Sequence, residues 1–143
     1  MGSVAFLFAG QGAQHPAMGV DLIEASPAAA EVRPGTSEQC RSASKEELSQ
    51  TVNTQPCVFV HDLAAAAALR ERGVVPAACA GFSLGEVAAL TFAGAFDTRA
   101  GFELVCERAA LADGGKLIFP KLAHGGVTVA FSKVTIELSF KER

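Results

Sequence analysis

The feature that most constrains the fold is a Gly-x-Ser-x-Gly pattern at residues 81–85. It lies between an apolar run at 74–80 and a helix-forming run. A serine displayed on a sharp turn between a strand and a helix needs this arrangement, because the turn strains the backbone and the helix must pack close to the strand. Ser83 is therefore a candidate nucleophile. The backbone N–H of Leu84, at the predicted helix start, would point toward an oxyanion formed on a substrate that Ser83 attacks.

The chain before this turn predicts a strand, a long helix and a second strand. Val4–Ala9 is a nearly continuous apolar run ended by Gly10, as expected for a strand buried on both faces of a parallel sheet. A helix is expected from Pro56 to about Arg72, followed by a buried strand at 74–80. Two parallel strands joined by a helix would bring the turn at 10–12 and Ser83 to the same edge of an α/β sheet.

Other helix starts are marked by capping residues, and one later helix has a clear apolar face. Starts are expected at Ser26-Pro27, at the capping box of Ser44 and Glu47, and after Asp97. The last of these helices carries its apolar face at Phe102, Val105, Cys106 and Ala109. Arg108 lies beside that face, where a solvated surface position is the ordinary interpretation.

Composition excludes several classes of protein. The 143 residues are 50% hydrophobic and 19% charged, with a net charge of −3, which fits one globular domain and gives no nucleic-acid footprint. The longest purely apolar run, Leu63–Leu69, is too short to span a membrane, and no basic leader precedes the first strand. The four cysteines have neither paired nor metal-type spacing, so reduced thiols in a cytoplasmic protein are expected, with no metal site.

Three motifs in order give a family resemblance: Phe8–Gln14 (FAGQGAQ), Asn53–Pro56 (NTQP) and Gly81–Glu86 (GFSLGE). Together they resemble the family of malonyl-CoA:acyl carrier protein transacylases and the acyltransferase domains of polyketide and fatty acid synthases. The resemblance extends from Val4 to about Ala112. It implies an α/β-hydrolase-like core, a mostly parallel sheet flanked by helices. It also implies malonyl transfer from coenzyme A to the phosphopantetheine thiol of acyl carrier protein through an acyl-serine. Coenzyme A thioester is then a substrate, and no bound cofactor is implied.

The resemblance also assigns roles to individual residues. The Gln11 backbone N–H would be a second oxyanion donor, and Gln55 would lie beside the pocket. Arg108 would pair with the malonyl carboxylate, since a guanidinium and a carboxylate form a bidentate pair. His124 would be the general base, because it is the one histidine that follows Ser83, as the family order requires.

The other two histidines are weaker candidates for the base, and one position departs from the family pattern. His61 lies in mid-helix, where a histidine more often packs or faces solvent, and Pro16 beside His15 suggests a turn. Phe82 stands where most of the family has histidine, so any polar role of that position is lost.

Residues 1–112 are expected to form the acyltransferase core with the nucleophile turn, whereas 113–143 match the family poorly. Alternating patterns predict strands at 127–129 and 134–140. The ferredoxin-like subdomain that the family inserts after the arginine helix is missing. We therefore hypothesise that the chain consists of pieces of a longer protein, with seams near residues 32–33 and between 112 and 126. Two alternatives stay open: a serine esterase or thioesterase using the same turn, and a non-catalytic fragment or acyl-binding module.

Overall fold

The computed structural model describes residues 3–32, 40, 42–113 and 138–139. In chain order its elements are β1 (Ala5–Phe8), α1 (Val20–Ala25), α2 (Pro27–Ala30), α4 (Lys45–Leu48), α5 (Thr51–Glu71), β2 (Ala78–Gly81), α6 (Leu84–Phe92), α7 (Thr98–Asp113) and β3 (Leu138–Ser139). β1 and β2 are parallel neighbours, with Phe8 opposite Gly81, and β3 pairs antiparallel with β2. The predicted α/β fold is confirmed.

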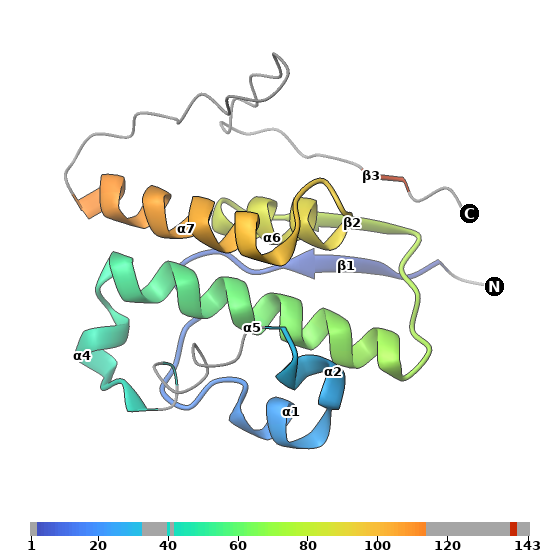
Figure 1. Ribbon diagram of the computed structural model, residues 1–143, viewed down its shortest axis with the longest axis horizontal. Helices are drawn as coiled ribbons and strands as arrows, with labels where there is room; N and C mark the ends of the chain where they lie inside the picture. Colours follow the sequence, from blue (N-terminus) through green and yellow to red (C-terminus); the bar gives the residue numbers. More distant parts are fainter. Residues whose placement is uncertain (1–2, 33–39, 41, 114–137, 140–143) are drawn as a thin grey trace, which may run out of the picture.

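The helices form a layer against this small sheet, with α5 as its longest member (Figure 1). α6 contacts both β1 and β2, and it also packs on α5 and α7. α7 runs beside α5, while α1 and α2 pack on α5 from another side. The strand–helix–strand order predicted for this region is therefore confirmed. It places the residues after β1 and the residues after β2 at the same edge of the sheet.

The burial of β1 differs from the expectation. Phe6 and Phe8 are buried, and each ring lies 5.5 Å from the ring of Phe92 on α6. Leu7 between them is 81% exposed. Side chains alternate between the two faces of a strand, and within the described residues the helices cover one face. The expectation of a strand buried on both faces is wrong for this part of the chain.

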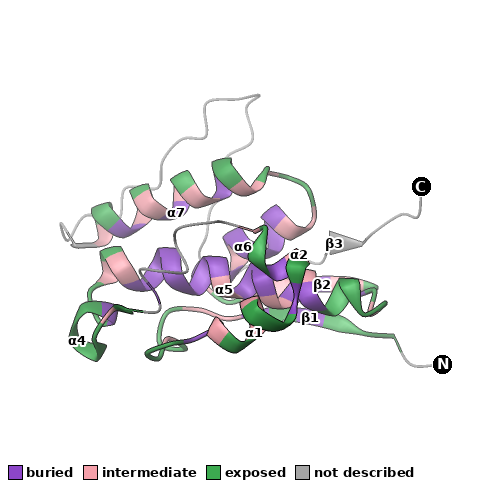
Figure 2. Ribbon diagram, turned by 60° about the horizontal axis from the view of Figure 1, so that its bottom comes forward, coloured by how far each residue is buried: buried purple, intermediate pink, exposed green. Residues whose placement is uncertain are grey.

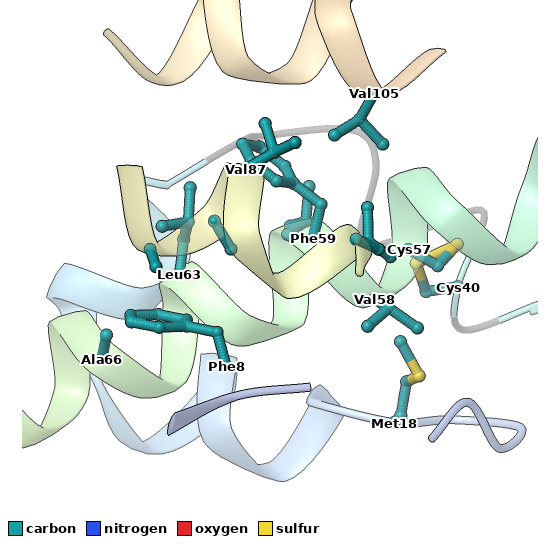
Figure 3. Packing of buried hydrophobic residues seen from close by; sticks show 14 of the residues in the cluster. Phe8, Met18, Cys40, Cys57, Val58, Phe59, Leu63, Ala66, Val87 and Val105 are labelled. Carbon is teal, nitrogen blue, oxygen red and sulfur yellow. A yellow bond between two sulfur atoms is a disulfide. The ribbon is translucent and has the colours of Figure 1, made fainter. Parts of the chain in front are cut away.

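The long helix α5 is buried almost all round (Figure 2). Phe59 is fully buried in the main core, in the same cluster as Val87 of α6 and Val105 of α7 (Figure 3). A helix with so little solvent contact derives its stability from packing, more than from intrinsic helix propensity. α7 shows its predicted face, with Val105 and Ala109 completely buried.

The start predicted for α5 at Pro56 is wrong, because the helix begins at Thr51. The Gln50 carbonyl accepts from the N–H groups of Asn53 and Thr54 at 2.9 and 2.8 Å. The Thr54 hydroxyl also donates to the carbonyls of Leu48 and Gln50. These bonds stabilise the first turn of α5. Pro56 lies in the second turn, where it removes only one N–H donor from the helix. The extension places Gln55 on the helix.

The other predicted helix starts are confirmed by their hydrogen bonds. The Ser26 hydroxyl accepts from the Ala29 N–H, and Ser44 and Glu47 form the complete capping box. Asp97 accepts from the Ala100 N–H at 2.7 Å ahead of α7. Each bond satisfies an N–H that has no partner within its helix.

The expectation of four reduced thiols is wrong for two of the cysteines. Cys40 and Cys57 form a disulfide, with their Cα atoms 5.8 Å apart, whereas Cys79 and Cys106 remain outside it. Their separation of 17 residues in sequence gave no pairing signal. The fold brings residue 40 onto the buried side of α5 (Figure 3).

The C-terminal predictions are covered only in part. Residues 138–139 of the predicted strand at 134–140 form β3, and the predicted strand at 127–129 lies outside the described residues. In the part of the chain that the structure describes, no helix combines the length and apolar character needed to cross a bilayer.

α6 reaches the sheet at a glycine. A Cβ added at Gly85 would lie 2.2 Å from the carbonyl oxygen of Phe8 and 2.7 Å from that of Ala9. Both neighbours are backbone atoms in or beside β1, so neither can move aside as a flexible side chain would. Glycine at this position lets the start of α6 pack on the end of β1.

Gly85→Ala should therefore destabilise the fold by about 2 to 3 kcal/mol, since overpacking against backbone forces the helix away from the strand. Urea unfolding followed by circular dichroism measures this change. Gly94→Ala is the matched control, because Gly94 has a φ of +83° but open space around it. Its cost should be about 1 kcal/mol, from backbone strain alone. An unfolding midpoint of Gly85→Ala equal to that of the unsubstituted chain would contradict the packing argument.

Candidate active site

The predicted turn at 81–85 is present, and its serine is strained. Ser83 has φ 54° and ψ −105°, stands between β2 and α6, and is the N-cap of α6. A Cβ added at Gly81 would lie 2.0 Å from the carbonyl carbon of Gly85, so the strand and the helix meet too closely for any other residue there. A non-glycine residue at positive φ persists only where its surroundings enforce it, and such strain is concentrated at functional sites.

Leu84 is the first residue of α6. The next two N–H groups are already bonded, from Gly85 to the Phe82 carbonyl and from Glu86 to the Ser83 carbonyl. The Leu84 N–H belongs to the first turn, whose donors have no acceptor within the helix. This is the position from which a helix start favours negative charge beside Ser83.

Arg108 reaches the serine from α7. One guanidinium nitrogen donates to the Ser83 hydroxyl oxygen at 2.9 Å, and another donates to the Gln55 side-chain oxygen at 2.6 Å. Burial lowers the pKa of Arg108 below its ordinary value, and the Glu86 carboxylate opposes that shift. An arginine stays protonated in proteins, so a fixed positive charge lies within hydrogen-bond distance of the candidate nucleophile.

The site continues through two amide side chains. The nitrogen of Gln55 donates to the side-chain oxygen of Gln11 at 3.3 Å, and the nitrogen of Gln11 donates to the Thr51 hydroxyl at 3.3 Å. Arg108 fixes the direction of this series of hydrogen bonds. A guanidinium can only donate, so the Gln55 side-chain oxygen must face Arg108 and its nitrogen must face Gln11. The structure thus joins Gln11, Gln55, Arg108 and Ser83, which come from four separate segments.

Glu86 was not singled out in the sequence, although it lies three residues after Ser83. Its backbone N–H donates to the Ser83 carbonyl at 3.2 Å. Burial raises the pKa of Glu86, whereas the Ser83 backbone N–H and Arg108 lower it. Glu86 therefore places a carboxylate near the guanidinium.

The three histidines fare differently. His124 lies outside the described residues, so its role as general base stays a prediction. His61 packs against Gly19 at the start of α1, and burial and His15 both lower its pKa. His15 contacts the carbonyl of Pro16. Among the described residues, neither His15 nor His61 hydrogen-bonds to Ser83.

Asp62 is a buried carboxylate that was not among the predicted site residues. It is 8% exposed on α5, and its Oδ2 has no hydrogen-bond partner among the described residues. Burial raises the pKa of Asp62 from 3.8 to about 7, and the Ala9 backbone N–H opposes the rise. Its signal in the sequence was an acidic residue inside an otherwise apolar helix. No group of three or more histidine, cysteine or acidic side chains in the described part of the chain could hold a metal.

The raised pKa of Asp62 makes a prediction about stability. Between pH 4 and 7 the folded chain keeps a proton on Asp62 that the unfolded chain has lost, so stability falls as pH rises through this window. The slope approaches roughly 1.4 kcal/mol per pH unit. Asp62→Asn removes the ionisation, so urea unfolding of both proteins at several pH values should show the unsubstituted chain losing stability relative to the variant. Equal pH dependence of the two proteins would contradict the raised pKa.

Comparison with known proteins supplies the context for this geometry. The acyl transferase domain family matches residues 5–115. A malonyl CoA-acyl carrier protein transacylase of Synechocystis is 42% identical over 123 residues, covering 79% of this chain and 42% of that protein. The Bacillus subtilis protein of the same name is 38% identical over 103 residues, covering 66% of this chain and 32% of that protein. The chain thus spans less than half the length of these relatives.

Solved structures agree with the sequence relatives. The malonyl-CoA:acyl carrier protein transacylase of Synechocystis superposes with a TM-score of 0.71 at 37% identity, covering 77% of this chain and 40% of that one. A malonyl transacylase solved in complex with a type II polyketide synthase acyl carrier protein gives a TM-score of 0.72 at 31% identity, covering 80% and 40%. An acyltransferase domain of the salinomycin polyketide synthase gives 0.73 at 36% identity, covering 79% and 29%.

Proposed function

This chain belongs to the acyl transferase domain family, and on that basis we propose that it carries the nucleophile of an enzyme that transfers malonyl groups from coenzyme A to acyl carrier protein. Relatives named for transacylases and for polyketide synthases support fatty acid or polyketide synthesis as its context. The expected cytoplasmic location is part of the same proposal.

The observation that carries this proposal is the bond between Arg108 and Ser83. It places a permanent cation, able to pair with a carboxylate in two parallel hydrogen bonds, 2.9 Å from the candidate nucleophile. A malonyl group has a carboxylate close to its thioester carbon. An acyl group with that charge is thus favoured over acetyl, whereas a general esterase has no need of the guanidinium.

The proposed reaction begins when the Arg108 guanidinium changes its hydrogen-bond acceptor. In the free protein the Ser83 oxygen accepts from Arg108, which engages a lone pair that attack requires. When the malonyl carboxylate pairs with Arg108, it replaces Ser83 as the acceptor. The hydroxyl is then available to attack the thioester while a base, assigned to His124, takes its proton.

The remaining steps use backbone donors. Attack places a negative charge on the thioester oxygen, and the N–H groups of Leu84 and Gln11 would bind it, with Gln55 holding both Gln11 and Arg108. The tetrahedral intermediate collapses, coenzyme A leaves as the thiol, and malonyl remains as an ester on Ser83. The phosphopantetheine thiol of acyl carrier protein attacks this ester in a second, equivalent step. The kinetics should be ping-pong.

Intact mass after mixing with malonyl-CoA tests the nucleophile. The unsubstituted chain should gain one malonyl group, and Ser83→Ala should gain none. Added acyl carrier protein should remove the group from the serine and acquire it. Rapid loss to water instead would favour the thioesterase alternative. If the unsubstituted chain binds malonyl-CoA but forms no adduct, the proposed transfer by this chain is wrong and it is an acyl-binding module.

Arg108→Gln tests the selectivity. Without the guanidinium, the ratio of the acylation rate with malonyl-CoA to that with acetyl-CoA should fall on the order of 10- to 100-fold, the value of one or two charge-assisted hydrogen bonds. Arg99→Gln is the matched control on the same helix, since Arg99 is exposed and pairs with Glu103 at 2.8 Å. A malonyl preference that survives in Arg108→Gln would show that Arg108 does not select the carboxylate.

A further inference from the structure

The side-chain amide of Gln11 is held at both ends by helix α5. Its oxygen accepts from the Gln55 nitrogen at 3.3 Å, and its nitrogen donates to the Thr51 hydroxyl at 3.3 Å. Thr51 and Gln55 occupy positions i and i+4, so they lie on the same face of the helix. Gln11 itself is exposed. A glutamine at the surface loses rotamer freedom when it is fixed, and two bonds to one helix oppose that loss.

The hydroxyl of Thr51 does not serve to begin the helix. Thr51 is the first residue of α5, and the N-cap is Gln50, whose carbonyl accepts from the N–H groups of Asn53 and Thr54 at 2.9 and 2.8 Å. A threonine that stabilises a helix start usually is the N-cap, where its side-chain oxygen accepts a first-turn N–H. The hydrogen bond that the structure gives to the Thr51 hydroxyl is instead the one with Gln11, 40 residues earlier in the chain.

The backbone of Gln11 lies between two glycines. Gly12 has a φ of +112° and open space around it. Its N–H donates to the side chain of Gln14 at 2.8 Å, and the Ala13 N–H donates to the Gly10 carbonyl at 3.4 Å. Neither bond involves Gln11, and glycine neighbours leave its peptide wide conformational freedom. The side-chain amide of Gln11 therefore supplies a restraint that the flanking glycines do not.

The residue before Gln11 links this turn to the candidate nucleophile. A Cβ added at Gly10 would lie 2.7 Å from the Phe82 carbonyl oxygen, immediately before Ser83. The backbone of Gly10 thus lies against the serine turn, and the peptide that follows it carries the N–H of Gln11. A rotation of this planar peptide changes the direction of the N–H while Gly10 stays in place. The direction of the N–H relative to Ser83 therefore depends on what holds Gln11.

We propose that Thr51 is a positioning residue, which holds the side chain of Gln11 and thereby sets the backbone N–H of Gln11 relative to Ser83. The inference rests on the proposed function, in which that N–H binds the oxyanion. Thr51 acts through an acceptor oxygen, because Gln55 engages the oxygen of the Gln11 amide and its nitrogen must then face an acceptor. Serine keeps that oxygen, whereas valine has the shape of threonine without it.

The test compares Thr51→Val and Thr51→Ser with a matched control, Thr98→Val. Thr98 is the first residue of α7, as Thr51 is of α5, and both are half-buried, but Thr98 does not bind the side chain of Gln11. Three readouts are used: the ¹⁵N order parameter of the Gln11 backbone N–H, the rate at which p-nitrophenyl acetate acylates Ser83, and kcat and KM for malonyl-CoA. The first readout needs no activity, and the second needs neither malonyl-CoA nor a carrier protein.

Thr51→Val should lower the order parameter of the Gln11 N–H from that of a rigid backbone, about 0.85, toward that of a flexible loop, below about 0.6. The acylation rate and kcat should fall about 3- to 10-fold, the size expected for the loss of one neutral hydrogen bond. KM should change little, because the role assigned to Thr51 involves no contact with the substrate. Thr51→Ser and Thr98→Val should stay near the unsubstituted chain.

A double-mutant cycle separates this role from a purely structural one. Gln11→Ala keeps the backbone N–H but removes the side chain through which Thr51 acts, so adding Thr51→Val to it should change neither the order parameter nor the rate. The proposal is overturned if Thr51→Val leaves either quantity unchanged, if Thr51→Ser falls as far as Thr51→Val, or if Thr51→Val has its full effect in the Gln11→Ala background. A chain that shows the expected order parameters and ester acylation but no malonyl transfer contradicts the proposed function alone.

Discussion

The close approach of α6 to the end of β1 is the constraint on which the site depends. Glycines at 81 and 85 allow it, since a Cβ at either position would lie within 2.2 Å of backbone atoms. The chain has no room to relax between these two contacts, so Ser83 is held at φ 54°. The same packing fixes the start of α6, whose first residue, Leu84, directly follows the serine. Strain in one residue is thus maintained by packing over several elements.

Helix α5 connects that turn to the rest of the site. Its apolar residues bury it against α6 and α7, which fixes the distance from which Arg108 reaches Ser83 and Gln55. Its polar residues Thr51 and Gln55 hydrogen-bond to the side chain of Gln11, in the segment after β1. Through Gln55, one helix therefore holds both Arg108 and Gln11. The disulfide between Cys40 and Cys57 attaches a further segment to the same helix.

The electrostatics of the site are dominated by one cation. Arg108 is half-buried and shares its hydrogen bonds between a hydroxyl and an amide, neither of which neutralises its charge. Glu86 is near enough to raise the pKa of Arg108, whereas burial lowers it. A guanidinium held by neutral acceptors is ready to bind a carboxylate. Under the proposed function, this property would separate the site from that of a hydrolase with the same turn.

Local patterns in the sequence determined much of this protein. The glycine spacing around Ser83 predicted the strained turn, the apolar runs predicted two parallel strands, and the capping residues at 26, 44 and 97 predicted three helix starts. These features depend on neighbours within a few residues, so the chain itself encodes them. The positions of Gln11, Gln55 and Arg108 were taken from a family resemblance, and the fold brings all of them to the serine.

Only the tertiary structure decided contacts between distant segments. Neither the disulfide nor the hydrogen bond from Gln55 to Gln11 has a signature in spacing, because each joins residues that only the folded chain brings together. The start of α5 at Thr51, by contrast, is held by bonds within a few residues, those to the Gln50 carbonyl and that of the Thr54 hydroxyl to Leu48, which outweigh the proline at 56. The burial of a strand residue also depends on the tertiary structure. Whether Leu7 faces a helix or solvent is decided by which elements cover that face of the strand, and the residues of the strand do not encode it.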